Sequence, residues 1–292
     1  MSTLVCFGFG YSAEHFVRMF GGKFDRIVGT VRTAERAAIL NAHGGGRLKA
    51  IVFDGNGAGP ALRDAVGDAN AVLVSAPPDG NGDPVLRVLA TVLAQAANLH
   101  SVVYLSTIGV YGDCGGAWVD EATPAKPGSA RGRERLAAEQ AWQELGARRG
   151  IAVAILRLAG IYGPDQNALA QLARGRARRI VKPGQIFNRI HVDDIARAID
   201  AALARRVSGI FNVADDEPTP SGDPIVFAAQ LMGVAPPPEI AFEQAAPNMS
   251  PMALSFWQEC RRVKNNKLKS ELGVSLLHPS YREGLRALFA ET

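Results

Sequence analysis

The first residues whose spacing points to chemistry are Gly8, Gly10 and Ala13, which form a GxGxxA pattern around Tyr11 in CFGFGYSAEHF. The pattern follows an apolar strand-like run and opens a helix-like one. In this context glycines permit a tight turn and let the backbone approach a dinucleotide pyrophosphate at a helix N-terminus. We expect these four residues to bind a dinucleotide. The alternative is a strand-to-helix turn that uses glycine only for its backbone freedom.

Arg32 follows the second strand-like run, where the adenosine ribose of a bound dinucleotide is expected. An acidic residue there would favour NAD, whereas an arginine suits the 2′-phosphate of NADP. We therefore expect NADP as the cofactor, with NAD as the alternative. If no cofactor binds there, we expect Arg32 to be a solvated side chain paired with Glu35.

Two further strand-like runs end in candidate cofactor contacts. Asp54 closes the third run and either accepts from the adenine amino group or serves as a turn residue. Ser75, Ala76 and Pro77 end the fourth run, where the backbone would pass beside the cofactor ribose.

The elements that position these residues alternate along the chain. Apolar runs alternating with amphipathic stretches predict an α/β fold, a Rossmann-type doubly wound parallel sheet covered on both faces. We expect residues 1–163 and 189–216 to form the nucleotide-binding domain, and residues 164–188 and 217–292 a small C-terminal cap that binds substrate. The strand-like runs are 3–10, 25–31, 48–54, 70–76, 101–107, 151–158 and 209–215, and the helix-like stretches are 13–20, 34–42, 60–66, 84–97, 133–147, 193–204 and 280–290.

Composition limits the classes of function. The 292 residues carry a formal charge of only +4, and the arginines are scattered without an aromatic-rich strand motif, so we expect no nucleic-acid partner. Three distant cysteines form neither a disulfide framework nor a zinc motif, and no apolar run reaches membrane-spanning length. We expect a cytoplasmic protein without membrane association and without a metal site. In RIHVDD, Asp193 is expected to be the N-cap of a helix.

Four longer stretches carry a family resemblance: YLSTIGVYGD at 104–113, LRLAGIYGP at 156–164, RIHVDDIARAI at 189–199 and FNVADDEP at 211–218. They resemble extended-type short-chain dehydrogenases/reductases of the NAD-dependent epimerase/dehydratase superfamily, over nearly the whole chain. In that family a serine or threonine, here Thr107, holds the substrate oxygen. A tyrosine then moves the proton, and a lysine four residues later binds the nicotinamide ribose.

The sequence departs from the family pattern YGxSKxxxE at the catalytic pair. In that register Arg131 replaces the tyrosine and Arg135 the lysine. Arg135 can still donate to ribose or phosphate oxygens, but a guanidinium stays charged and cannot act as acid or base. Tyr111 and Tyr162 are the alternative proton donors, with packing roles as the competing interpretation. The departure resembles the atypical members of the superfamily, which lack the catalytic tyrosine.

Three functions remain open. The first is an NADP-dependent oxidoreductase or epimerase of a small carbonyl or hydroxyl compound, the second a non-catalytic NADP(H) sensor or regulator, and the third a nucleotide-sugar epimerase or dehydratase. The short segment 163–190 argues against a nucleotide sugar. The cluster Arg174, Arg176, Arg178 and Arg179 either attracts an anionic substrate or is solvated. The resemblance also implies a homodimer formed by helices 84–97 and 133–147.

Overall fold

The computed structural model describes residues 1–291, which form two compact units. Unit 1 comprises residues 1–107, 130–157 and 195–211, and unit 2 comprises 108–129, 158–194 and the chain from 212 onward. The segment 108–129, placed with the nucleotide-binding domain by the sequence, therefore clusters with unit 2. Residues 158–163, 189–194 and 212–216, which the sequence placed in the same domain, also cluster with unit 2. The assignment of one domain to the dinucleotide and of the other to the substrate stays a prediction.

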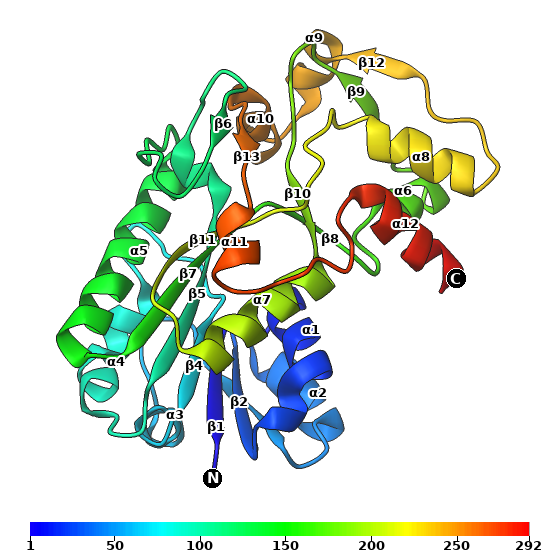
Figure 1. The fold of residues 1–292 in the computed structure, drawn as a ribbon. Helices are drawn as coiled ribbons and strands as arrows, with labels where there is room; N and C mark the ends of the chain where they lie inside the picture. The colour runs from blue at the N-terminus through cyan, green and yellow to red at the C-terminus, as the bar shows by residue number, and fades with distance from the viewer. Residues whose placement is uncertain (292) are drawn as a thin grey trace. The chain divides into compact units, whose positions relative to one another are not determined.

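A seven-stranded sheet is the core of unit 1, in the order β11-β7-β5-β4-β1-β2-β3 (Figure 1). The pairs from β5 to β3 are parallel, and the chain crosses from the edge strand β3 back to β4 beside β1. Each strand lies within the run predicted for it, so the α/β fold is confirmed. The strands are β1 (Thr3–Phe7), β2 (Arg26–Val31), β3 (Leu48–Val52), β4 (Ala71–Val74), β5 (Ser101–Thr107), β7 (Ala152–Leu158) and β11 (Gly209–Val213).

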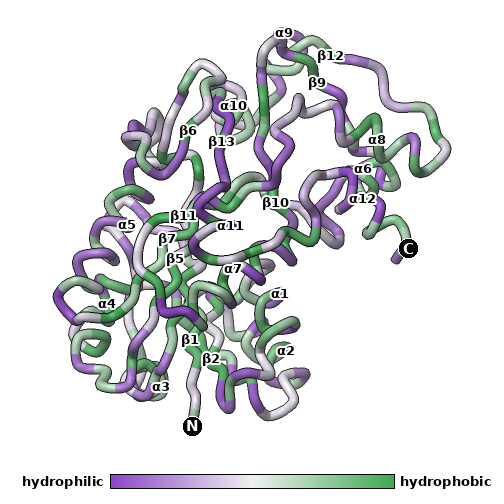
Figure 2. Tube along the Cα trace, in the orientation of Figure 1, coloured by the Kyte–Doolittle hydropathy of each residue, from purple (hydrophilic) through white to green (hydrophobic). Residues whose placement is uncertain are grey.

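Helices cover both faces of this sheet, with α3, α4 and α5 on one side and α1, α2 and α7 on the other (Figure 1). The apolar residues gather in the strands between them, as Figure 2 shows, because burial of both faces removes the need for alternation. The helices are α1 (Tyr11–Phe20), α2 (Ala34–His43), α3 (Pro60–Gly67), α4 (Pro84–Gln95), α5 (Ala130–Arg149) and α7 (Val192–Arg205).

Asp83 joins two of these helices. Its carboxylate caps α4 by accepting from the N–H groups of Val85 and Leu86 at 2.9 and 3.0 Å, and it also accepts from the indole N–H of Trp142 in α5 at 3.1 Å. Such an N-cap satisfies orphan donors of the first turn. The same side chain therefore starts α4 and fixes it against α5.

The two helices proposed for dimerisation supply much of the core of unit 1. Leu89 and Leu93 of α4 are fully buried within the protomer, so they are core residues, whereas Leu86 and Leu136 are partly buried. A homodimer through this face stays a proposal, and only the partly buried positions remain available to it.

A buried ion pair ties α5 to the sheet. Glu139 of α5 and Arg157 of β7 have side chains 1% and 4% exposed, and the guanidinium donates to both carboxylate oxygens at 2.7 to 3.2 Å. The Ser106 hydroxyl of β5 donates to the same carboxylate. Charges out of water are tolerated only when paired and hydrogen-bonded, so this geometry fixes the position of α5 along the strands.

Unit 2 is built from short elements around its own core. Its three two-stranded parallel ladders pair β8 (Gly160–Tyr162) with β10 (Arg189–His191), β9 (Arg179–Val181) with β12 (Glu239–Ala241), and β6 (Trp118–Val119) with β13 (Arg262–Val263). Apolar residues of α6, α8 and α12 pack around Tyr162. The helices are α6 (Ala168–Ala173), α8 (Asp223–Leu231), α9 (Phe242–Ala245), α10 (Pro251–Gln258), α11 (Asn266–Ser270) and α12 (Tyr281–Ala290).

Among residues 1–291, no helix combines the length and the apolar character needed to cross a bilayer.

Replacing Glu139 with Ala should lower the free energy of unfolding by about 3–5 kcal/mol, because it leaves the Arg157 guanidinium buried without its counter-charge. Urea denaturation followed by circular dichroism measures the change. Glu134→Ala, at a half-exposed position in the same helix, is the matched control. If Glu139→Ala lowers the free energy of unfolding no more than Glu134→Ala does, the Glu139–Arg157 pair does not hold α5 in place.

Candidate functional site

The glycine-rich turn lies between β1 and α1 in unit 1. Gly8 has a φ of +80°, and a Cβ built on it would lie 2.7 Å from the backbone nitrogen of Ala76. The Ser75 and Ala76 N–H groups both donate to the Phe7 carbonyl, at 2.7 and 3.0 Å. Gly8 is thus required by the protein itself, since β1 and the end of β4 approach too closely for a side chain. This contact brings the predicted residues Gly8, Ser75 and Ala76 together, with the exposed Pro77 next in the chain.

Gly10 differs, because no protein atom demands a glycine there. It is the N-cap of α1 without a side-chain cap, and a Cβ built on it would meet nothing within 4 Å. Tyr11 and the buried Ala13 form the first turn of that helix. A helix N-terminus with open space at its cap fits an anionic pyrophosphate, which is the group that the spacing of Gly8, Gly10 and Ala13 predicts.

Arg32 lies exposed just past β2 and makes no ion pair with any residue from 1 to 291. The predicted alternative, a pair with Glu35, is not formed. The neighbouring Arg36 instead binds Glu14 of α1 at 2.5 Å. Arg32 is therefore the cation after β2 that remains available to a 2′-phosphate.

Asp54 acts as a turn residue within the protein. Its carboxylate accepts from the backbone and side-chain N–H groups of Asn56 at 2.9 and 3.1 Å, and these bonds lower the pKa of Asp54. The carboxylate is exposed and retains acceptor capacity, so an adenine contact stays a prediction.

The two arginines in the register of the catalytic pair differ in their surroundings. Arg135 reaches the end of β5, where its guanidinium donates to the Leu105 carbonyl at 2.7 Å and to the Tyr104 hydroxyl at 3.3 Å. Tyr104 itself is fully buried, as its strand position predicts. Arg131 is exposed in the first turn of α5. Only Arg135 is therefore held at the carboxyl end of the central strands.

The three candidates for substrate chemistry are divided between the units. Thr107 is the last residue of β5 in unit 1, whereas Tyr111 and Tyr162 belong to unit 2. Tyr111 is 1% exposed and donates to the Asn212 side chain at 2.8 Å. Tyr162 is 7% exposed and donates to the Ser280 carbonyl at 3.3 Å. Burial raises the pKa of Tyr162. Because both hydroxyls are buried and hydrogen-bonded within the protein, both have the surroundings of structural tyrosines.

The histidine of RIHVDD takes the role that Asp193 was expected to have. Helix α7 starts at Val192, so Asp193 lies inside its first turn, and His191 Nδ1 accepts from the Asp193 N–H at 3.2 Å.

His278 packs against His191 with ring centroids 4.0 Å apart, a neighbour that the sequence did not indicate. The ligand atoms of the two histidines and Asp193 lie within 4.8 Å of one another. The absence of a metal site stays our expectation.

The predicted basic cluster is partly neutralised by carboxylates of unit 2. Arg174 pairs with Asp165 at 3.4 Å and Arg179 with Glu239 at 2.8 Å. Arg176 and Arg178 are exposed and make no ion pair within residues 1–291. An anionic substrate at this cluster stays a prediction, carried by these two side chains alone.

Sequence reasoning missed Asp215, which follows β11 and is 2% exposed. One oxygen accepts from the Glu217 N–H at 3.2 Å, and the other is buried without a hydrogen-bond partner among the described residues. Burial raises the pKa of Asp215 to about 8. The sequence offers one signal for Asp215, which is its position directly after a strand. It lies in the acidic stretch ADDEP, however, and acidic residues in such a stretch are usually solvated.

Asp215 makes the free energy of unfolding fall as the pH rises. An ordinary salt-bridged carboxylate has the opposite effect. Its pKa rises from 3.8 to about 8 on folding, so its stabilising contribution is present below pH 4 and is lost as the pH rises to about 8. Within that window the free energy of unfolding falls by about 1.4 kcal/mol for each pH unit, because the unfolded carboxyl has released one proton that the folded carboxyl keeps. Asp215→Asn should flatten this part of the dependence and stabilise the protein at pH 8, measured by urea denaturation from pH 5 to pH 8. The exposed Asp64→Asn should change nothing; an unaltered slope in Asp215→Asn would refute the assignment.

Three comparisons place these features among known proteins. The family model described as "NAD dependent epimerase/dehydratase family" matches residues 80–214. A structure of a functionally unknown conserved protein from Silicibacter pomeroyi is 44% identical, with a TM-score of 0.89 over 100% of this chain and 99% of the other. A Streptomyces 3-diazoavenalumate denitrifying reductase is 28% identical over 150 residues, 49% of this chain and 49% of the reductase, so the chain spans about half the length of that relative.

A more distant structure supports the fold. The dTDP-glucose 4,6-dehydratase from Bacillus anthracis, in complex with NAD, is 16% identical with a TM-score of 0.77 over 99% of this chain and 96% of the other. The glycine turn after β1, the seven-stranded sheet and the matched family model agree. The chain is therefore similar to the NAD-dependent epimerase/dehydratase family over residues 80–214, and it shares its fold with the dehydratase over nearly its whole length.

Proposed function

We propose that the protein is an NADP-dependent oxidoreductase or epimerase that acts on a small carbonyl or hydroxyl compound and lacks the usual catalytic tyrosine. The observation that carries the proposal is the pair Gly8 and Gly10. The first glycine is demanded by the protein, and the second leaves open space at the N-terminus of α1. When bound, the nicotinamide of the cofactor supplies or accepts a hydride.

The preference for NADP rests on Arg32. Its guanidinium lies free after β2, where the family's NAD-binding members would place a carboxylate on the ribose. A planar guanidinium can donate two parallel hydrogen bonds to a phosphate, which explains selectivity for the phosphorylated cofactor.

Arg135 takes over the binding role of the family lysine. It already donates to the Leu105 carbonyl, and its remaining N–H groups are available to ribose hydroxyls. It cannot move a proton, and neither can Arg131. The proton therefore passes through water or the Thr107 hydroxyl rather than through a tyrosine in the usual register.

A sensor or regulator is the second candidate. It is favoured by Tyr111 and Tyr162, whose hydroxyls are already bonded to Asn212 and the Ser280 carbonyl and so do not replace the missing acid. A sensor would bind the cofactor, change an interface and release it unaltered. A nucleotide-sugar enzyme is the least favoured, because the segment 163–190 is short.

Turnover separates the first two candidates. Purified protein should oxidise NADPH in the presence of at least one member of a broad panel of small aldehydes, ketones and imines, followed by the loss of absorbance of the reduced nicotinamide. Binding of NADPH without turnover across the panel would favour the sensor. A shift of the melting temperature by nucleotide sugars would revive the third candidate.

Arg135→Ala should weaken NADPH binding about tenfold or more, because it removes charge-assisted hydrogen bonds to the ribose. Fluorescence titration measures the dissociation constant. Arg148→Ala, an exposed arginine at the other end of the same helix, should leave it unchanged. If Arg135→Ala binds NADPH as tightly as Arg148→Ala does, the alignment of α5 with the family pattern YGxSKxxxE is wrong.

Arg32→Asp should weaken NADPH binding by about tenfold while leaving NADH binding nearly unchanged, since only NADPH carries the 2′-phosphate. Arg36→Asp makes the same change of charge nearby and reports the long-range electrostatic effect. An equal loss of both cofactors in Arg32→Asp would contradict the proposed phosphate site.

A further inference from the structure

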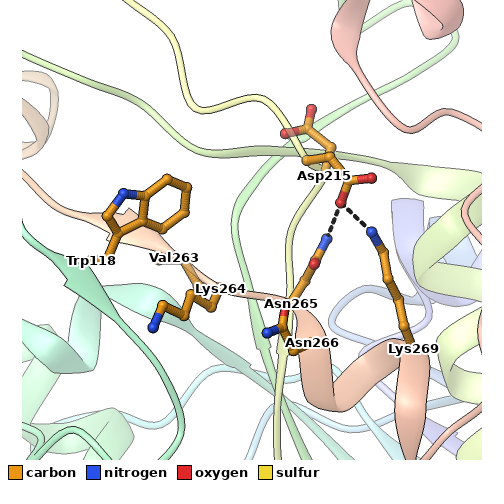
Figure 3. A pocket seen from close by; sticks show the side chains of 8 residues that line it. Trp118, Asp215, Val263, Lys264, Asn265, Asn266 and Lys269 are labelled. Atoms are coloured by element: carbon orange, nitrogen blue, oxygen red, sulfur yellow. Dashed lines mark hydrogen bonds and ion pairs between the residues drawn. The ribbon is translucent and has the colours of Figure 1, made fainter.

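A second site lies wholly within unit 2, beside the ladder of β6 and β13 and the start of α11. It is a pocket of about 330 Å³ whose lining includes Trp118, Val263, Lys264, Asn265 and Lys269. In Figure 3, Trp118, Val263 and Lys264 lie on one side of the pocket, opposite Asn265 and Lys269. The functions considered above use none of these side chains.

One wall of the pocket is held in place by Asp216. Its carboxylate accepts from the Asn265 amide at 2.6 Å and from the Lys269 ammonium at 2.5 Å. Asn265 also donates to the Ala214 carbonyl at 2.8 Å. These bonds fix the wall before any ligand arrives, which lowers the cost of binding.

The rest of the lining carries groups that the protein does not use. The Trp118 ring is 53% exposed and contacts no other ring or cation within residues 1–291. The exposed side chains of Lys264 and Asn266 make no hydrogen bond or ion pair with the rest of the described chain. An indole ring, an ammonium and an amide therefore line the pocket without partners among the described residues.

The charge of the pocket favours an anion. Lys264 and Lys269 bring two ammonium groups, whereas Asp216 brings one carboxylate. The buried Asp215 adds little negative charge at neutral pH, because burial raises its pKa to about 8. The Lys264 charge is not neutralised by any side chain of the described residues.

We propose that this pocket binds a planar aromatic carboxylate, with the ring against Trp118 and the carboxylate on Lys264 and the Asn266 amide. An aromatic ring stacks on an indole face, and an ammonium donates charge-assisted hydrogen bonds to a carboxylate. The volume accommodates one or two rings with a single acid group. All of these residues belong to unit 2, whereas the dinucleotide turn belongs to unit 1.

Calorimetric titration of the full chain with cinnamate, without any dinucleotide, tests the proposal. Cinnamate should bind, whereas cinnamamide, which lacks the charge, and 3-cyclohexylpropanoate, which lacks the aromatic ring, should each bind about fivefold more weakly or worse. Because no cofactor is present, the result does not depend on whether the proposed oxidoreductase function is right.

Two variants with matched controls locate the site. Trp118→Leu and Lys264→Gln should each weaken cinnamate binding about fivefold or more. Phe256→Leu, at another exposed aromatic residue, and Lys126→Gln, at another exposed lysine of unit 2, should leave it unchanged. Circular dichroism confirms that each variant is folded.

Four results would overturn the proposal. The first three are the absence of cinnamate binding, equal binding of cinnamate by Trp118→Leu and Phe256→Leu, and equal binding of cinnamamide and cinnamate. The fourth concerns adenosine 5′-monophosphate. If it binds through Trp118 and Lys264 more tightly than cinnamate, the pocket is a nucleotide site and the carboxylate assignment is wrong.

Discussion

The buried ion pair between Glu139 and Arg157 determines where α5 lies on the sheet. Both charges are out of water, and the carboxylate also accepts from Ser106, so any shift of the helix along the strands would leave a charge unpaired. The position of Arg135 follows from this constraint. Glu139 is one helical turn beyond Arg135, so anchoring the first brings the second to the Leu105 carbonyl at the end of β5.

The arginines at the start of α5 are a second electrostatic feature of unit 1. Cations at a helix N-terminus are unfavourable, because the macrodipole is positive there. An anionic ligand bound at that terminus would offset this unfavourable electrostatic energy. The glycine turn supplies the place for such a ligand: Gly8 lets β1 approach the end of β4, and Gly10 leaves the N-terminus of α1 open. Under the proposed function, the phosphates of a bound dinucleotide would lie at the uncapped N-terminus of α1 and offset the positive charge at the start of α5.

The fold could be predicted closely from the sequence, because fully buried parallel strands are continuous apolar runs that periodicity detects. The site could be predicted only in part. Gly8 and Arg32 are signalled by local spacing, but the bond of Tyr111 to Asn212 joins residues 101 positions apart, which no local pattern reports. His191 replaced Asp193 as the group that meets the helix start, since an imidazole nitrogen can accept an N–H as a carboxylate does.

The elements of unit 2 show the same limit. Its strands are two or three residues long, too short for alternation to be visible, so the sequence predicts neither β6 nor β13. Trp118 and Lys264 lie far apart in the chain, and only the ladder brings them to one pocket. Asp215 could not be identified as a buried carboxyl because its sequence neighbours Asp216 and Glu217 resemble a solvated acidic loop.

We propose above that unit 1 binds a phosphorylated dinucleotide at the glycine turn. Side-by-side fluorescence titration of the unaltered protein with NADPH and NADH tests this binding. We expect saturable binding of NADPH that is tighter than that of NADH. Failure of both to bind would contradict it, and would mean that the open N-terminus of α1 and the arginines of α5 serve another anion.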